Sequence, residues 1–157
     1  MKNKTPFFSV VVTTYNRKDL LKKNISSILN QTFTDFELII IDNYSDDNTE
    51  NLIKSFNNKN IKFIKNHNNG ILAKSRNIGI KNCNGNIITF IDSDDTWHPQ
   101  KLRKQLNFLD KNNYNFIFCG YKKILKKKSI KVTTKSKYLD YKDLLKSCEI
   151  GLSTVMI

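Results

Sequence analysis

The chain has 157 residues, which fits one domain, and 39% of them are hydrophobic, enough for one core. Its apolar runs fall short of the ~20 residues that span a bilayer, and Met1–Pro6 is too polar for a secretory signal. Cys83, Cys119 and Cys148 lack C-x-x-C spacing, so we interpret them as buried thiols. We expect a cytoplasmic protein with a single domain over residues 1–157.

The formal net charge is +13, and residues 122–137 contribute eight lysines and no acid. Such an excess favours anionic partners, which include nucleotides, nucleic acid and anionic lipid surfaces. A solvated lysine-rich face is the simpler interpretation of the same run. Because the run lacks interleaved aromatic and arginine residues, we expect no nucleic acid partner, and a basic nucleic-acid-binding domain is a weaker alternative.

The first half of the chain alternates buried strands with helices. Residues 8–14 (FSVVVTT) are a β-branched apolar run, typical of a strand buried on both faces. Leucines and isoleucines at helical spacing then predict a helix over about 17–30. A second buried strand is expected at 36–42, followed by turn residues and a helix over about 48–57. Residues 61–64 predict a short third strand.

The second half continues the alternation. A helix is expected over about 71–83, and Asn84-Gly85 ends it. Residues 86–91 (NIITFI) predict a fourth strand that runs into an acidic cluster. Pro99 starts another helix, and residues 115–120 (NFIFCG) predict a fifth strand.

The last segments are less regular. The lysine stretch 122–137 predicts a hairpin or an exposed sheet edge, which lysine protects from aggregation. The pattern of residues 140–148 predicts a helix with approximate ends, and Leu152–Ile157 predicts the start of a final strand. The whole pattern indicates an α/β fold with a mostly parallel central sheet flanked by helices on both faces.

Three polar clusters, Thr13–Asn16, Asp42–Asp47 and Asp92–Asp95, follow predicted strands. In parallel sheets, ligands bind beyond the carboxyl ends of the strands. We therefore expect the three clusters to meet at one rim of the sheet and to form a binding site there.

The cluster Asp92-Ser93-Asp94-Asp95 places three carboxylates within four residues. Such carboxylates repel one another unless a cation lies among them, and hard oxygen ligands suit Mg²⁺ or Mn²⁺. A metal there would neutralise charge on a leaving diphosphate. The alternative is a strand-end turn in which Asp95 caps the helix that follows.

Four ordered stretches carry a family resemblance. They are Ser9–Arg17, Glu37–Thr49, the segment Asn69-Gly70-Ile71 with Ala73, Arg76-Asn77 and Gly79, and Ile88–Leu102 around the acidic cluster. Together they resemble the family 2 glycosyltransferases, which have the nucleotide-diphospho-sugar transferase fold known as GT-A. Each stretch alone is a weak signal, and their shared order makes the resemblance specific. It covers the chain from about residue 8 to the end.

The resemblance implies a nucleoside pocket built by the first two stretches. Thr13, Tyr15 and Asn16 would contact the nucleoside, with the Tyr15 ring offering a surface for the base. The family usually has a base-reading acid where this chain has Asn43. An amide still donates and accepts, so a pyrimidine remains readable, as in a UDP- or dTDP-sugar. Asp42 is either a second base contact or a cap of the strand end.

The other two stretches imply the diphosphate and metal site. Arg76 matches an arginine of the family that reaches the diphosphate or the base-recognising loop, a task that suits a guanidinium fork. Asp92 and Ser93 would lie on the sugar side. Asp94, with Asp92, is the metal ligand that the resemblance implies, for Mn²⁺ or Mg²⁺. Trp97 is interpreted as a packing anchor.

The resemblance also implies a function. We expect a metal-dependent, inverting transfer of sugar to a glycan or lipid-linked acceptor in surface polysaccharide synthesis. Inversion needs a general base, which in this family follows the acidic cluster in the acceptor-binding part. This chain holds no matching acid before Ile157. We therefore expect a truncated chain that holds the donor-binding part, and a nucleotide-sugar-binding module without turnover is the alternative.

Two further expectations concern partners. An apolar strand at the chain end predicts exposed apolar surface and hence a homodimer. The lysine run predicts a peripheral location at the inner face of the membrane, near a lipid-carried acceptor.

Overall fold

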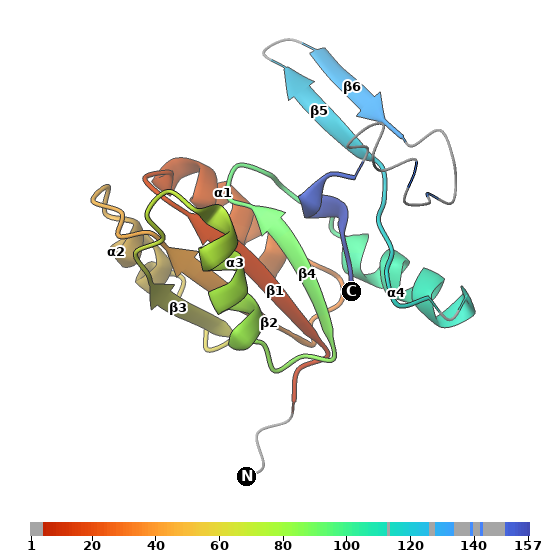
Figure 1. Ribbon diagram of the computed structural model, residues 1–157, viewed down its shortest axis with the longest axis horizontal. Helices are drawn as coiled ribbons and strands as arrows, with labels where there is room; N and C mark the ends of the chain where they lie inside the picture. The colour runs from red at the N-terminus through yellow and green to blue at the C-terminus, as the bar shows by residue number, and fades with distance from the viewer. Residues whose placement is uncertain (1–4, 113, 126–127, 134–138, 140–141, 143–149) are drawn as a thin grey trace.

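The computed structural model describes residues 5–112, 114–125, 128–133, 139, 142 and 150–157. Four parallel strands form its central sheet in the order β3-β2-β1-β4 (Figure 1). They are β1 (Phe8–Thr14), β2 (Phe36–Asp42), β3 (Ile61–Lys65) and β4 (Ile87–Asp92). The predicted parallel α/β sheet is confirmed, with strand boundaries close to the expected ones.

Helices cover both faces of this sheet, as expected (Figure 1). They are α1 (Lys18–Leu29), α2 (Thr49–Ser55), α3 (Leu72–Lys81) and α4 (Lys101–Asn112). α3 lies against β1 and β2, where Gly79 approaches Val11 so closely that an added Cβ would collide with its side chain. A glycine is therefore required there to seat the helix that carries Arg76. α4 begins at Lys101 instead of Pro99, because residues 99–100 form a turn.

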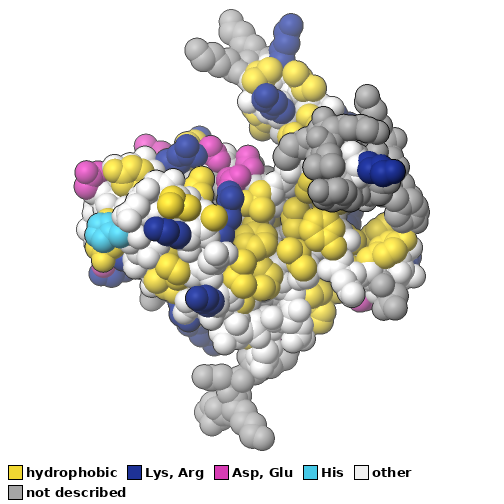
Figure 2. All heavy atoms as spheres, viewed as in Figure 1, with side chains coloured by type: hydrophobic (Ala, Val, Ile, Leu, Met, Phe, Trp, Pro, Cys, Tyr) yellow, Lys and Arg dark blue, Asp and Glu magenta, His cyan; other side chains and the backbone are white. Residues whose placement is uncertain are grey.

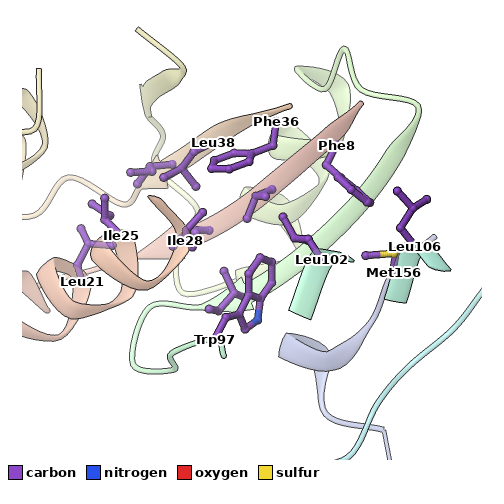
Figure 3. Close-up of a cluster of buried hydrophobic side chains, with 14 of the residues drawn as sticks. Phe8, Leu21, Ile25, Ile28, Phe36, Leu38, Trp97, Leu102, Leu106 and Met156 are labelled. Atoms are coloured by element: carbon purple, nitrogen blue, oxygen red, sulfur yellow. The ribbon is translucent and has the colours of Figure 1, made fainter. Parts of the chain in front are cut away.

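The main core lies on the face of the sheet opposite α3 (Figure 3). Phe8, Val10 and Val12 point into it from β1, because successive side chains of a strand point to opposite faces. α1 contributes the stripe that its spacing predicts: Leu21, Ile25 and Ile28 are each 0% exposed. The close-up also shows Trp97, Leu102 and Met156 gathered beside this cluster.

The β4 edge of the sheet continues only as single bridges. Met156 pairs in antiparallel fashion with Thr89 on one side and with Ile117 on the other. The predicted strand at 115–120 is therefore wrong in extent, since its described residues pair through Ile117 alone. The predicted strand at Leu152–Ile157 is also wrong at its start, where Leu152–Thr154 forms a 3₁₀ turn. Backbone oxygens of this turn accept hydrogen bonds from side chains: Trp97 Nε1 donates to Ser153 O and Gln105 Nε2 donates to Thr154 O.

The lysine-rich stretch forms a hairpin, which confirms one of the two expected arrangements. β5 (Tyr121–Leu125) pairs in antiparallel fashion with β6 (Lys128–Val132). The pair forms a two-stranded sheet separate from the central one. The helix expected over about 140–148 lies outside the described residues, apart from Lys142.

Cys83 and Cys119 are free and half-buried, so the prediction of full burial is wrong for both. Burial raises the pKa of each thiol above its usual value, which keeps both protonated at neutral pH. Cys148 lies outside the described residues. Among helices in the described part of the chain, none combines the length and the apolarity that crossing a bilayer requires.

Candidate functional site

A pocket of about 380 Å³ opens at the carboxyl ends of β1 and β4. Its lining comes from all four sequence motifs: Thr13, Thr14, Tyr15, Arg17, Asn43, Asn68, Gly70, Leu72, Arg76, Asp92, Ser93 and Asp94. The register of the parallel strands explains this convergence, since Thr13 lies opposite Asp92 and Thr14 opposite Asp42. Of the predicted site residues, the pocket brings together Thr13, Tyr15, Asn43, Arg76, Asp92, Ser93 and Asp94.

Two arginines form ion pairs with the carboxylates of Asp92 and Asp94 in this pocket. These two residues belong to the turn at the end of β4, Asp92–Asp95, which we call the acidic turn. Arg76 Nη2 lies 3.1 Å from Asp92 Oδ1, and Arg17 Nη1 lies 2.6 Å from Asp94 Oδ2. The Arg17 and Asp94 side chains are 49% and 45% exposed, so water screens their ion pair and another cation can replace the guanidinium. Arg17 was not predicted as a site residue, although it is the last residue of the first motif.

Hydrogen bonds with Asn24 and Ser153 fix the acidic turn. Asn24 is fully buried on α1, and its Nδ2 donates to Asp92 O at 3.0 Å and to Asp95 O at 2.8 Å. The Ser153 hydroxyl accepts the Asp92 N–H at 3.0 Å and donates to Asp95 Oδ2 at 2.5 Å. Asp95 therefore binds Ser153 and does not line the pocket. Neither residue was predicted, but a polar Asn24 among the apolar residues of α1 was a usable signal.

Trp97 packs beneath the turn as the sequence predicts. Its side chain is buried, and its Nε1 donates to Ser153 O at 2.8 Å. Lys101 Nζ lies 4.0 Å from the centre of the Trp97 ring. Burial disfavours the charged form and lowers the pKa of Lys101 to about 8. Contact with the face of the ring favours the cation and opposes this effect.

Asn16 and Asp42 shape the rim without lining the pocket. The Asn16 backbone N–H donates to Ser45 Oγ, and Asn16 Oδ1 accepts the Asp46 N–H at 3.0 Å. Asp42 is 1% exposed and accepts both the Ser45 N–H and the Ser45 hydroxyl. Of the two roles left open for Asp42, its contacts are those of a strand-end cap.

Asn43 faces the pocket with a defined orientation of its amide. Its Oδ1 accepts the Asn68 N–H at 2.9 Å, which leaves Nδ2 as the donor available to a ligand. Asn68 is itself buried, and its Nδ2 donates to Ser75 Oγ. Beside them, the Tyr44 and His67 rings stack with centroids 3.7 Å apart. Asn68 and the ring stack were not predicted from sequence.

The donor set fits a metal only in part. Within the described residues, no group of three or more His, Cys, Asp and Glu side chains is arranged to hold an ion. Asp92 and Asp94 supply two carboxylates, and each already faces a cationic group. A divalent ion at this turn would need further oxygens from a ligand or water, which is how Mg²⁺ commonly binds with phosphates.

Residues 9–153 match the sequence model of the family described as Glycosyl transferase family 2, and this match spans most of the chain. The parallel sheet with its rim pocket is the GT-A arrangement that the resemblance implies. The chain therefore belongs to glycosyltransferase family 2.

Two curated relatives and one solved structure illustrate the likeness. An Escherichia coli protein, UDP-Glc:alpha-D-GlcNAc-diphosphoundecaprenol beta-1,3-glucosyltransferase WfgD, is 34% identical over 95% of this chain and 59% of its own length. The putative teichuronic acid biosynthesis glycosyltransferase TuaG of Bacillus subtilis is 32% identical over 100% of this chain and 64% of its own. The crystal structure of S. aureus TarS 1-349 in complex with UDP-GlcNAc matches with a TM-score of 0.75 and 28% identity. That match covers 83% of this chain and 38% of TarS 1-349. The chain thus spans about three fifths of the length of these two curated relatives.

Proposed function

We propose that residues 1–157 form the donor-binding part of a single GT-A domain that transfers sugar from a nucleotide-diphosphate sugar. The observation that carries the proposal is the shared pocket, lined by Asn43 after β2, Tyr15 after β1 and the Asp92–Asp94 turn at the end of β4. A nucleoside against Tyr15 and Asn43 would extend its diphosphate toward Arg76 and the acidic turn. The donor is a UDP- or dTDP-sugar, since Asn43 retains a donor for a pyrimidine carbonyl.

We also propose that the reaction is metal-dependent and inverting. Asp94 and Asp92 would hold Mn²⁺ or Mg²⁺, which supplies positive charge to the departing nucleoside diphosphate. Arg76, already turned toward Asp92, would bind the same diphosphate. The acceptor hydroxyl attacks the anomeric carbon, its proton passes to a general base, and the nucleoside diphosphate leaves. We assign that base to no residue of this chain.

The acceptor we propose is a glycan or lipid-linked sugar in the synthesis of a surface polysaccharide. Support comes from the relatives, one named for transfer to a diphosphoundecaprenol-linked sugar and another for teichuronic acid biosynthesis. Such an acceptor lies in a membrane, so the protein would work in the cytoplasm at the inner face of that membrane. Association of two copies over apolar surface near Ile157, which is 52% exposed, stays a prediction.

A second candidate function is nucleotide-sugar binding without turnover. The same pocket supports it, because its lining serves binding of a nucleotide sugar and we assign no general base to it. Both candidates predict binding of the donor, and they differ in transfer to an acceptor.

Both candidate functions require that the protein binds a nucleotide sugar, and a thermal-shift screen of nucleotide sugars with Mn²⁺ tests this. We expect UDP- or dTDP-sugars to raise the melting temperature, and no response to any nucleotide sugar would contradict both candidates. Incubation of the responding donor with a lipid-diphosphate-linked sugar then separates them. Transfer supports the enzyme, whereas binding without product supports the binding module.

A further inference from the structure

The β5–β6 hairpin is exposed on both of its faces. Every residue of the two strands is exposed to solvent except Val132, which is half-buried. Ile124 is 79% exposed, and Leu125 and Ile130 are 45% and 49% exposed. A two-stranded hairpin is at best marginally stable in water by itself. Its apolar side chains therefore indicate that a partner covers part of this surface.

Strand register sorts the hairpin into two faces. A Cβ added at Gly151 would lie 3.5 Å from the Tyr121 ring, so the face of the hairpin that carries Tyr121 turns toward the body of the protein at its base. The opposite face, which we call the outer face, presents Lys122, Ile124, Ser129 and Lys131. Lys122 lies directly across from Lys131 on it. Like charges in this position destabilise a strand pair, and an anion placed against them would relieve that cost.

We propose that the outer face of the hairpin binds an anionic lipid bilayer. Lysines around an exposed isoleucine give charge for lipid phosphates and an apolar side chain for the headgroup boundary, while the lysine stems cover apolar surface. A second copy of the same cationic face would be repelled, so charge complementarity favours the bilayer over self-association.

The hairpin lies at the same end of the molecule as the acidic turn of the pocket (Figure 1). It projects from the end of the molecule at which β4 finishes and the acidic turn begins (Figure 1). The space-filling view shows its lysine and apolar side chains on a projection beyond the body of the protein (Figure 2). Contact through the hairpin would hold the end of the molecule that carries the pocket near a membrane surface. This orientation rests on the proposed transfer to a lipid-linked acceptor, whereas bilayer binding itself does not.

Vesicle co-sedimentation of the 157-residue chain tests the proposal. We expect binding to vesicles that mix phosphatidylglycerol with phosphatidylcholine, and little binding to phosphatidylcholine alone. The double variant Lys122→Glu/Lys131→Glu should bind the anionic vesicles at least roughly 30-fold more weakly. The control Lys22→Glu/Lys23→Glu changes the net charge equally, from exposed positions on α1, and should weaken binding much less.

A further variant separates the apolar contribution to vesicle binding from the electrostatic contribution. Ile124→Ser should weaken binding in a way that persists at high salt, because it removes an apolar contact. Equal loss in both double variants, equal binding to neutral vesicles, or tighter binding to duplex DNA than to anionic vesicles would overturn the proposal. So would an Ile124-dependent dimer in place of vesicle binding. Nucleotide binding measured on the same hairpin variants should be unchanged, which keeps this test independent of the donor site.

Discussion

The Ser153 hydroxyl donates to Asp95 Oδ2 at 2.5 Å and accepts the backbone N–H of Asp92 at 3.0 Å. One side chain from the end of the chain thus fixes both ends of the acidic turn. Asn24 binds the carbonyl oxygens of the same two residues from α1. The turn is therefore held from two sides, and this leaves the carboxylates of Asp92 and Asp94 to face the pocket.

Loss of either support should loosen the turn. Asn24→Ala leaves two backbone carbonyls without their buried donor, so we expect the free energy of unfolding to fall by about 1–3 kcal/mol. The metal-dependent part of nucleotide affinity should fall with it, because Asp92 and Asp94 lose their fixed spacing. Chemical denaturation and calorimetric titration measure the two effects.

Variants at Ser153 provide the matched control for this prediction. Ser153→Thr keeps a hydroxyl and should retain the metal effect on nucleotide affinity, whereas Ser153→Ala should reduce it. If both Ser153 variants show the same metal effect on nucleotide affinity as the unchanged protein, the acidic turn does not depend on the hydrogen bonds of Ser153.

The orientation of the Asn43 amide predicts a weak preference between pyrimidines. Its Oδ1 is taken by the Asn68 N–H, so its Nδ2 offers a donor, which suits carbonyl oxygens of both uracil and cytosine. Asn43→Asp would instead offer an acceptor to the ring N–H that uracil has and cytosine lacks. We expect this variant to raise the ratio of UDP to CDP affinity by about tenfold. An unchanged ratio in competition titrations would remove Asn43 from base recognition.

Lys101 predicts an unusual dependence of stability on pH. Burial lowers its pKa from 10.5 to about 8 in the folded state. Between these two values the unfolded chain binds the proton and the folded chain does not, so this group makes stability rise with pH over that window. The gain is at most about 3 kcal/mol, since contact with the Trp97 ring favours the cation.

Comparison with Lys101→Met isolates this contribution. The variant keeps a long side chain but lacks the titrating group, so its stability should rise less between pH 8 and 10.5. Denaturation curves at several pH values measure the difference. Parallel pH profiles for the two proteins would show that Lys101 does not titrate as proposed.

Much of this architecture follows from local patterns in the sequence. The alternation of apolar strands and amphipathic helices predicted the parallel sheet, and strand ends predicted the rim where Thr13, Asn43 and Asp92 meet. The family resemblance added roles that spacing alone does not provide. The strand expected at 115–120 reduced to a bridge, because pairing at a sheet edge depends on which backbone lies beside it.

Long-range side-chain contacts were beyond prediction from a single sequence. Asn24 and Asp95 are 71 positions apart, and the place of Asn24 among the apolar residues of α1 marks it as unusual without indicating which turn it binds. The same holds for Ser153, which lies in a 3₁₀ turn where a strand was expected. Only the three-dimensional arrangement assigns these two residues to the support of the site.

The central claim is that the Asp92–Asp94 turn binds a divalent ion together with a nucleoside diphosphate. Calorimetric titration of UDP with and without Mn²⁺ tests it, using Asp94→Ala and the exposed Asp110→Ala on α4 as a control. We predict that Mn²⁺ strengthens UDP binding to the unchanged protein and to Asp110→Ala, and that Asp94→Ala abolishes the gain. Identical UDP affinity with and without Mn²⁺ in the unchanged protein would contradict the claim.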